Sequence, residues 1–230
     1  MWFLSPAESS ALAVSLRVAA EALLIGLPIA TTSALLLARR RAAGWFLLDG
    51  LLHLPLVLPP VVLGYLLLLS LGSRAPLGHW LATHTGLRLP FTVHGAALAT
   101  ALMTLPILVR TIRLAREQVD GELLEMARLM GARPLDRFLS VTLPLISPGL
   151  IAGLVMAFAA SLGEFGAVIT FAGNVPGATQ TLPLALYSAL DAPDGDVAAL
   201  RLALIAIALG VSGLALAEFA GRRLARALGR

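Results

Sequence analysis

The chain has 230 residues, of which 58% are hydrophobic and 13% are charged, and its mean hydropathy is +0.89. An ordinary globular domain has about 25% charged residues, so this composition excludes a soluble protein with a normal polar surface. The net charge of +4 comes from arginine without any lysine, and because no aromatic residues alternate with the arginines, nucleic acid is not an expected partner.

Five stretches are apolar and long enough to cross a bilayer, which takes about 20 residues in a helix. In chain order they cover about 11–38, 46–71, 89–113, 146–171 and 197–219. The apolar run that contains the fourth is too long for one straight crossing, so it is expected either to break near Glu164 or to form a re-entrant piece, and a sixth span stays open. The sequence predicts one all-α domain over 1–230, an integral membrane protein with membrane lipids around it.

Arginines are concentrated after the first span, between the third and fourth, and after the fifth. They are Arg39, Arg40, Arg41, Arg110, Arg113, Arg116, Arg128, Arg133, Arg137, Arg222, Arg223, Arg226 and Arg230. Cytoplasmic loops of membrane proteins retain positive charge. We therefore expect an inner-membrane protein with its N-terminus outside and its C-terminus in the cytoplasm.

A charged loop over about 117–144 separates the third and fourth spans. Asp120 can cap a helix there, because its side chain can accept from the first free amides, and Gly131 can end that helix. One apolar face recurs at three- and four-residue steps and consists of Leu123, Met126, Ala127 and Met130. This segment is an interfacial helix among lipid headgroups, a solvated loop, or a surface that another protein binds.

The sequence lacks the residues that several kinds of enzyme and metal site require. The phosphate-binding loop G-x-x-x-x-G-K-[ST] requires a lysine, which this chain does not contain, and there are no cysteines. The histidines have no metal-ligand spacing, and no nucleophile motif occurs. The chain is therefore not expected to be an enzyme or to hold a cofactor or metal of its own.

The charged loop resembles the EAA loop of bacterial ABC importer permeases, which is written E-A-A-x3-G-x9-I-x-L-P. The matching positions, all at the family's spacing, are Glu125, Met126, Ala127, Gly131, Val141, Leu143 and Pro144. Met126 stands where the motif has its second alanine, and Val141 stands where it has isoleucine; both remain apolar.

The resemblance implies a type I ABC importer permease fold, in which this loop is the coupling helix that docks into a separate cytoplasmic ATPase. ATP and Mg²⁺ would be bound by that ATPase. It also implies a homodimer with the pore at the subunit interface, and a periplasmic or lipid-anchored binding protein that delivers the substrate.

Three further stretches are similar to the molybdate branch of that family, which makes molybdate, with tungstate, the expected substrate. They are "LLHLPLVLPPVVLGYLLL" at 51–68, "LPILVRTIRLA" at 105–115 and "SLGEFGAVITFAGNVPGATQTLPLALY" at 161–187. Sulfate and thiosulfate permeases share a similar G-E-[FY]-G element, so a sulfate permease is the alternative. An ion-driven secondary transporter is the rival from another class, but it should carry paired buried charges and inverted repeats.

Candidate residues for the translocation path come from the second and fourth spans. Proline breaks or kinks a helix, and the freed carbonyls are tolerated against protein or a water-lined cavity, which makes Pro60 and the nearby Gly64 path candidates. Glu164, flanked by Gly163 and Gly166, is a carboxylate in an apolar run. Because a carboxylate repels a dianion, Glu164 is expected to be a gate, a hinge or a structural hydrogen-bond acceptor.

Overall fold

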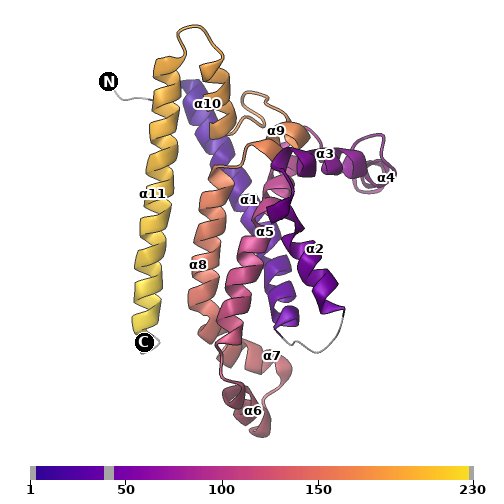
Figure 1. The fold of residues 1–230 in the computed structure, drawn as a ribbon, viewed down its shortest axis with the longest axis vertical. Helices are drawn as coiled ribbons and strands as arrows, with labels where there is room; N and C mark the ends of the chain where they lie inside the picture. The colour runs from indigo at the N-terminus through magenta and orange to yellow at the C-terminus, as the bar shows by residue number, and fades with distance from the viewer. Residues whose placement is uncertain (1–3, 39–43, 228–230) are drawn as a thin grey trace.

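Four long helices lie roughly side by side along the long axis of the molecule (Figure 1). In the computed structural model, which describes residues 4–38 and 44–227, they are α1 (Pro6–Leu37), α5 (Val93–Glu117), α8 (Leu143–Leu162) and α11 (Asp196–Ala227). All four lie in helical segments that are long and apolar enough to cross a membrane. Three of the expected loop arginines, Arg39, Arg40 and Arg41, and the terminal Arg230 lie outside the described residues.

The centre of the bundle is α5, which packs against α1, α2, α8 and α9. Its first turn is capped by Thr92, whose Oγ1 accepts from the Gly95 amide at 3.1 Å. The buried face of α1 beside it is built largely from small residues, among them Ala19, Ala22, Gly26, Ala30 and Ala34. A Cβ at Gly26 would lie 3.3 Å from Leu108 of α5. Small residues at this contact let the two backbones approach closely, as is common between membrane helices.

The expected span over 46–71 is not one straight helix. It consists of α2 (Trp45–Val57) and α3 (Pro60–Leu71), which meet at an angle of 116°. Leu58 and Pro59 between them have extended ψ values of 138° and 135°. A proline disfavours helical geometry in the residue before it, so two consecutive prolines hold both linking residues out of the helix. Pro60 then begins α3 at a position where its missing N–H costs nothing.

The long apolar run around the fourth expected span is also interrupted. After α8 ends at Leu162, the chain turns through three residues before α9 (Gly166–Ala172). A loop then leads to α10 (Leu182–Leu190) and α11, while α4 (Pro76–Thr85) projects beyond α3 (Figure 1). These short helices gather at the end of the bundle where α1 begins.

The charged loop lies at the opposite end of the bundle, where α11 ends (Figure 1). It contains α6 (Gly121–Leu129), the single-turn α7 (Pro134–Arg137) and the π-helical turn η1 (Phe138–Thr142), which continues into α8. We refer to residues 121–142 as the α6–η1 segment.

Ion pairs connect α1 to its neighbours. Arg17 Nε lies 2.8 Å from Glu21 Oε1 one helical turn further along α1, and Glu21 Oε2 lies 2.8 Å from Nδ1 of His94 on α5. Nearer the start of α1, Glu8 is 4% exposed and its Oε2 accepts from Arg201 Nη2 on α11 at 2.9 Å. The first and last long helices are thereby joined through a buried carboxylate.

Candidate functional site

Helix α6 has well-defined ends that follow from its sequence. Asp120 Oδ1 accepts from the Glu122 amide at 2.9 Å, as expected of an N-cap. At the other end, Gly131 has φ +83°, and the Ala132 and Gly131 amides donate to the carbonyls of Ala127 and Arg128, both at 3.0 Å. This is the Schellman arrangement, which requires the left-handed backbone that glycine adopts most easily.

The apolar face of α6 is not covered by the rest of the described chain. No residue of α6 is buried, and the exposed fractions are 45% for Leu123, 58% for Met126, 82% for Leu129 and 87% for Met130. Ala127 is half-buried and Glu125 is exposed. An exposed row of Leu and Met at helical spacing is a suitable contact surface for a groove in another protein.

Two further positions of the loop motif, Leu143 and Pro144, lie apart from this face. They form the first turn of α8, which continues directly from η1. They therefore set the point at which the α6–η1 segment enters the membrane-spanning bundle.

Three of the five path candidates come together where α3 crosses α9. A Cβ at Gly64 would lie 2.7 Å from both the Ala167 carbonyl oxygen and Thr170 Cβ, and a Cβ at Gly166 would lie 2.8 Å from Pro60 Cβ. Only glycine allows these backbones to approach so closely. The second half of the broken second span, α3, is thus packed against α9, the short helix that follows α8.

The other two path candidates lie in the break between α8 and α9. Gly163 is the C-cap of α8, and Glu164 is half-buried, with its Oε1 accepting from the Ala167 amide at 3.0 Å. Glu164 therefore satisfies one of the free amides at the start of α9. This contact matches the expected structural acceptor and leaves the gate and hinge interpretations untested.

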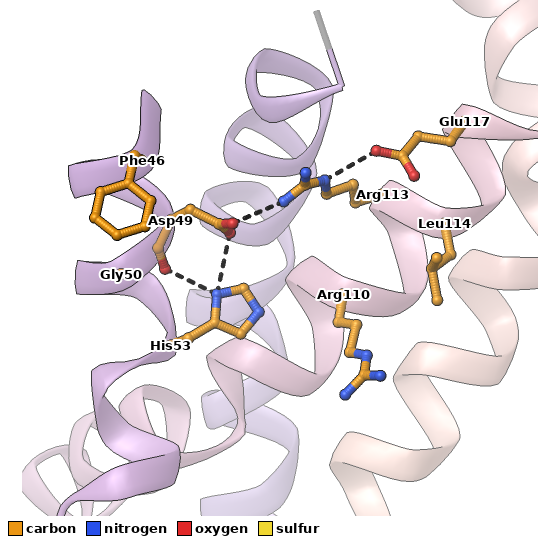
Figure 2. A pocket seen from close by; sticks show the side chains of 8 residues that line it. All are labelled: Phe46, Asp49, Gly50, His53, Arg110, Arg113, Leu114 and Glu117. Atoms are coloured by element: carbon orange, nitrogen blue, oxygen red, sulfur yellow. Dashed lines mark hydrogen bonds and ion pairs between the residues drawn. The ribbon is translucent and has the colours of Figure 1, made fainter. Parts of the chain in front are cut away.

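A hollow of about 480 Å³ between α2 and α5 contains functional groups that the sequence analysis did not single out (Figure 2). Arg113 Nη1 donates to Asp49 Oδ2 at 3.0 Å, and Arg113 Nε donates to Glu117 Oε1 at 3.1 Å. Nδ1 of His53 lies 2.8 Å from the Asp49 carbonyl oxygen. Figure 2 shows Arg110 beside this network without a bond to it.

The ion pair of Arg113 with Asp49 connects α2, the first half of the second span, to the central helix α5. One feature of the sequence could have indicated this network: Asp49 and His53 are four residues apart in an otherwise apolar stretch and therefore share a helix face.

A bundle of apolar helices, one of its spans broken and packed through α3 against α9, with an uncovered amphipathic helix on a loop at one end, is the architecture of a multi-pass membrane protein. Residues 23–226 match the family model described as "Binding-protein-dependent transport system inner membrane component". The chain belongs to this family. It is an inner-membrane permease component of an ABC importer and not the ATPase subunit, as the loop motif predicts.

Several curated relatives resemble the chain over almost its whole length. It is 48% identical over 219 residues to the molybdenum transport system permease protein ModB of Escherichia coli (strain K12), covering 95% of this chain and 96% of that protein. It is 46% identical over 223 residues to ModB of Haemophilus influenzae, covering 97% of each. ModB of Mycobacterium tuberculosis is 39% identical over 211 residues, or 91% of this chain and 80% of that protein.

Solved structures support the fold. A bacterial ABC transporter involved in the import of the acidic polysaccharide alginate matches with a TM-score of 0.72 and 20% identity, over 97% of this chain and 81% of that one. The inward-facing MetNI methionine ABC transporter matches with a TM-score of 0.68 and 20% identity, over 100% and 98%. The type I importer permease fold expected from the loop motif is thereby confirmed.

Proposed function

We propose that this chain is the permease subunit of an ATP-driven importer that carries molybdate, and with it tungstate, across the inner membrane. The observation that carries the proposal is the 46–48% identity to molybdenum transport permeases over at least 95% of the chain. Molybdate and tungstate are tetrahedral dianions of nearly equal size, so a path that admits one has little means of rejecting the other. A sulfate permease is the alternative within the same class.

ATP hydrolysis is assigned to a separate cytoplasmic subunit, which would bind ATP and Mg²⁺. The chain has no lysine and so no phosphate-binding loop. Helix α6 is the proposed docking element for that ATPase, with Met126 and Ala127 in its groove and Glu125 at the rim. Its uncovered apolar face and rigid caps support this role, because a coupling element must transmit force without fraying. Gly131, Leu143 and Pro144 fix its end and its connection to α8.

The proposed orientation places α6 and the end of α11 in the cytoplasm and the start of α1 outside. The arginines at 110, 113, 116, 128, 133 and 137 then lie on the cytoplasmic side, where positive charge is retained. Two copies of the chain would form the pore between them. A binding protein, periplasmic or lipid-anchored, would dock at the end that carries α4, α9 and α10.

Transport would proceed by alternating access. Closure of the ATPase dimer on ATP would move α6 inward, and α8 would transmit that movement from its first turn at Leu143 and Pro144. The packed halves α3 and α9, with Pro60, Gly64 and Gly166 at their contact and Gly163 and Glu164 in the adjoining break, are the proposed gate region. Rigid halves joined at a break can rotate without losing their internal hydrogen bonds.

Uptake of radiolabelled molybdate tests the proposal directly. Cells expressing this chain with its own ATPase and binding protein are expected to accumulate the label, and the accumulation should stop when ATP is depleted. A matched strain with an ATPase that cannot hydrolyse ATP is the control. Continued uptake in that control would contradict an ABC mechanism and favour an ion-driven transporter.

Competition by sulfate separates the two substrate branches. We expect excess sulfate to leave molybdate uptake unchanged, since capture by the binding protein would select the larger oxyanion. Abolition of uptake by sulfate would assign the chain to the sulfate branch and leave the architecture intact.

A further inference from the structure

A hollow of about 290 Å³ lies at the end of the molecule that carries α4. Its walls come from the end of α3, the turn after it, α4, and the segment 86–92 that leads into α5. It is separate from the α2–α5 hollow of Figure 2. The lining residues with polar side chains are Ser73, His79, Thr83 and Arg88.

Backbone contacts hold the walls of this hollow in place. A Cβ at Gly78 would lie 2.3 Å from the carbonyl oxygens of both Leu71 and Gly72, so only a glycine lets α4 lie this close to the end of α3. On the other side, the Phe91 amide donates to the Phe171 carbonyl of α9 at 3.2 Å. The hollow is therefore enclosed between α4 and a segment that is bonded to the proposed gate helix α9.

Three donor groups in the lining are not engaged. The Arg88 guanidinium, the His79 ring and the Ser73 hydroxyl make no hydrogen bond or ion pair with the part of the chain that the structure describes. Thr83 differs, because its Oγ1 donates to the His79 carbonyl at 2.9 Å. A guanidinium carries five N–H donors, and an imidazole donates in either protonation state. The lining can thus donate several hydrogen bonds to one acceptor.

The positive charge of this hollow has no local carboxylate to neutralise it. The sequence contains no Asp or Glu from Gly50 to Arg116, a range that includes every wall of the hollow. Helix α4 packs chiefly against α3, which lies within the same range. Arg74, on the turn between these two helices, adds a second positive charge nearby. An anion is therefore attracted here and meets no competing acidic side chain.

The two flanks of α4 differ in character. His79 and Thr83 line the hollow on one flank, whereas Leu77, Trp80 and His84 share the other. Leu77 and Trp80 are both exposed, and the Trp80 ring stacks on His84 with centroids 5.0 Å apart. Tryptophan is favoured at the membrane–water interface. This flank is suited to lipid headgroups, which leaves the flank with the hollow for the outer solution.

We propose that this hollow receives the transported tetrahedral oxyanion at the outer end of the permease, held by Arg88 with His79 and Ser73. The inference rests on the function proposed above and adds the place where the substrate enters. A planar guanidinium pairs with two oxygens of such an anion at once, and the imidazole and the hydroxyl can donate to the others.

The position of the hollow suits an entry site. Helix α3 leads from it to the contact with α9, and the bond of Phe91 to Phe171 joins its other wall to α9 directly. A single unpaired arginine in an open hollow holds an anion weakly, because water screens the charge. Weak binding lets the anion move on toward the gate, while tight capture stays with the binding protein.

Protection of an introduced cysteine tests the proposal. Thr83→Cys places a thiol in the lining at an exposed position whose hydroxyl is not one of the three free donors. The complex of permease and ATPase, in nanodiscs of phosphatidylcholine without binding protein or nucleotide, is labelled with N-ethylmaleimide, and the labelled site is located by mass spectrometry. We expect molybdate to slow the labelling in a saturable way, and chloride at equal ionic strength to leave it unchanged. Val175→Cys, outside the hollow, should be labelled equally with and without molybdate.

Variants in the Thr83→Cys background assign the protection to Arg88. Arg88→Gln should raise the half-protecting molybdate concentration by about tenfold or more, and Arg88→Lys, which keeps the charge and loses the planar fork, should raise it less. Arg74→Gln removes one charge from the same end of the molecule but outside the lining, and should be protected as the parent is. Each variant is compared with itself without molybdate, which cancels any effect of the charge on the thiol.

Three results would overturn the entry site. They are absence of protection by molybdate, equal protection in Arg88→Gln, and protection by phosphatidylglycerol in the discs without any molybdate, which would assign the hollow to a lipid phosphate. Molybdate uptake by whole cells reports the proposed function separately. Intact uptake without protection would remove this site and keep the molybdate importer, whereas absence of uptake would remove the function on which the site rests.

Discussion

Gly64 and Gly166 are required by what surrounds them rather than by their own backbone conformations. Neither has a positive φ; each is required because a backbone or a ring lies where a side chain would be. Single atoms therefore control how closely α3 approaches α9.

Gly64→Ala should weaken that contact. Its Cβ would lie 2.7 Å from the Ala167 carbonyl oxygen, so α3 must move away, and overpacking of this kind costs about 1–3 kcal/mol. We expect a lower thermal midpoint of the purified protein and reduced molybdate uptake. Gly210→Ala on α11 is the matched control, because a Cβ there meets nothing within 4 Å. Equal midpoints for the two variants would contradict a close-packed contact at Gly64.

Glu164 can be assigned a role by two substitutions. Glutamine keeps an oxygen that accepts from the Ala167 amide, whereas alanine removes it, and loss of a cap costs about 0.5–2 kcal/mol. If Glu164 is a structural acceptor, Glu164→Gln should transport like the parent protein and Glu164→Ala should lose both thermal stability and uptake. Loss of uptake in Glu164→Gln with unchanged stability would instead indicate that the charge itself acts in the gate.

At the scale of elements, α6 is short yet capped at both ends, by Asp120 and by the Gly131 turn. Isolated helices of this length are marginal in water, and no residue of α6 is fully buried, so the caps are needed to maintain its shape. A helix kept folded without a partner is suited to bind one.

Met126→Glu should disrupt that binding. Burial of a methionine contributes about 1.5–3 kcal/mol, so replacing it with a charge is expected to weaken association of the ATPase by at least about tenfold. Titration of the ATPase onto the permease in nanodiscs measures the effect. Glu122→Gln, on the polar face, is the control and should bind within about threefold of the parent. Unchanged affinity for Met126→Glu would favour the interfacial-helix interpretation.

At the scale of the whole molecule, the short helices α4, α9 and α10 occupy one end and the α6–η1 segment occupies the other (Figure 1). The two ends have different tasks in the proposed importer, one facing the binding protein and the other the ATPase. Orientation in the membrane decides which end meets which partner.

Introduced cysteines can establish this orientation, because the chain contains none. Val175→Cys, at a position 47% exposed, and Leu135→Cys, at one 65% exposed, mark the two ends. In spheroplasts expressing the permease without its ATPase, a membrane-impermeant maleimide should label Val175→Cys at once and Leu135→Cys only after permeabilisation. The reverse pattern would overturn the proposed topology.

Local patterns predicted local structure well. The caps at Asp120 and Gly131 each depend on residues within a few positions of one another. Pro60 indicated a break or kink in the second span, but the angle of 116° depends on how α3 packs against α9, a distant segment. Helix α4 was missed although Pro76 and Gly86 are ordinary start and stop signals.

Contacts between distant positions could not be predicted in this way. Arg113 and Asp49 are 64 residues apart, so nothing local links them. A hollow of about 250 Å³ beside η1 was missed for the same reason, since its walls come from five separate elements, α1, α5, α6, α7 and η1. The roles of the coupling and path residues remain predictions, to be decided by the variants above.

The pair of Glu8 with Arg201 has a consequence for how the protein is made. Glu8 is synthesised before its partner Arg201, which follows 193 residues later in the chain. At about 5–20 residues per second, translation of that interval takes roughly 10–40 s. During this time the Glu8 carboxylate can accept from the nearby Ser5 amide, but its ion pair with Arg201 can form only after α11 has been made. The pairing of α1 with α11 is therefore a late step in the membrane assembly of this permease.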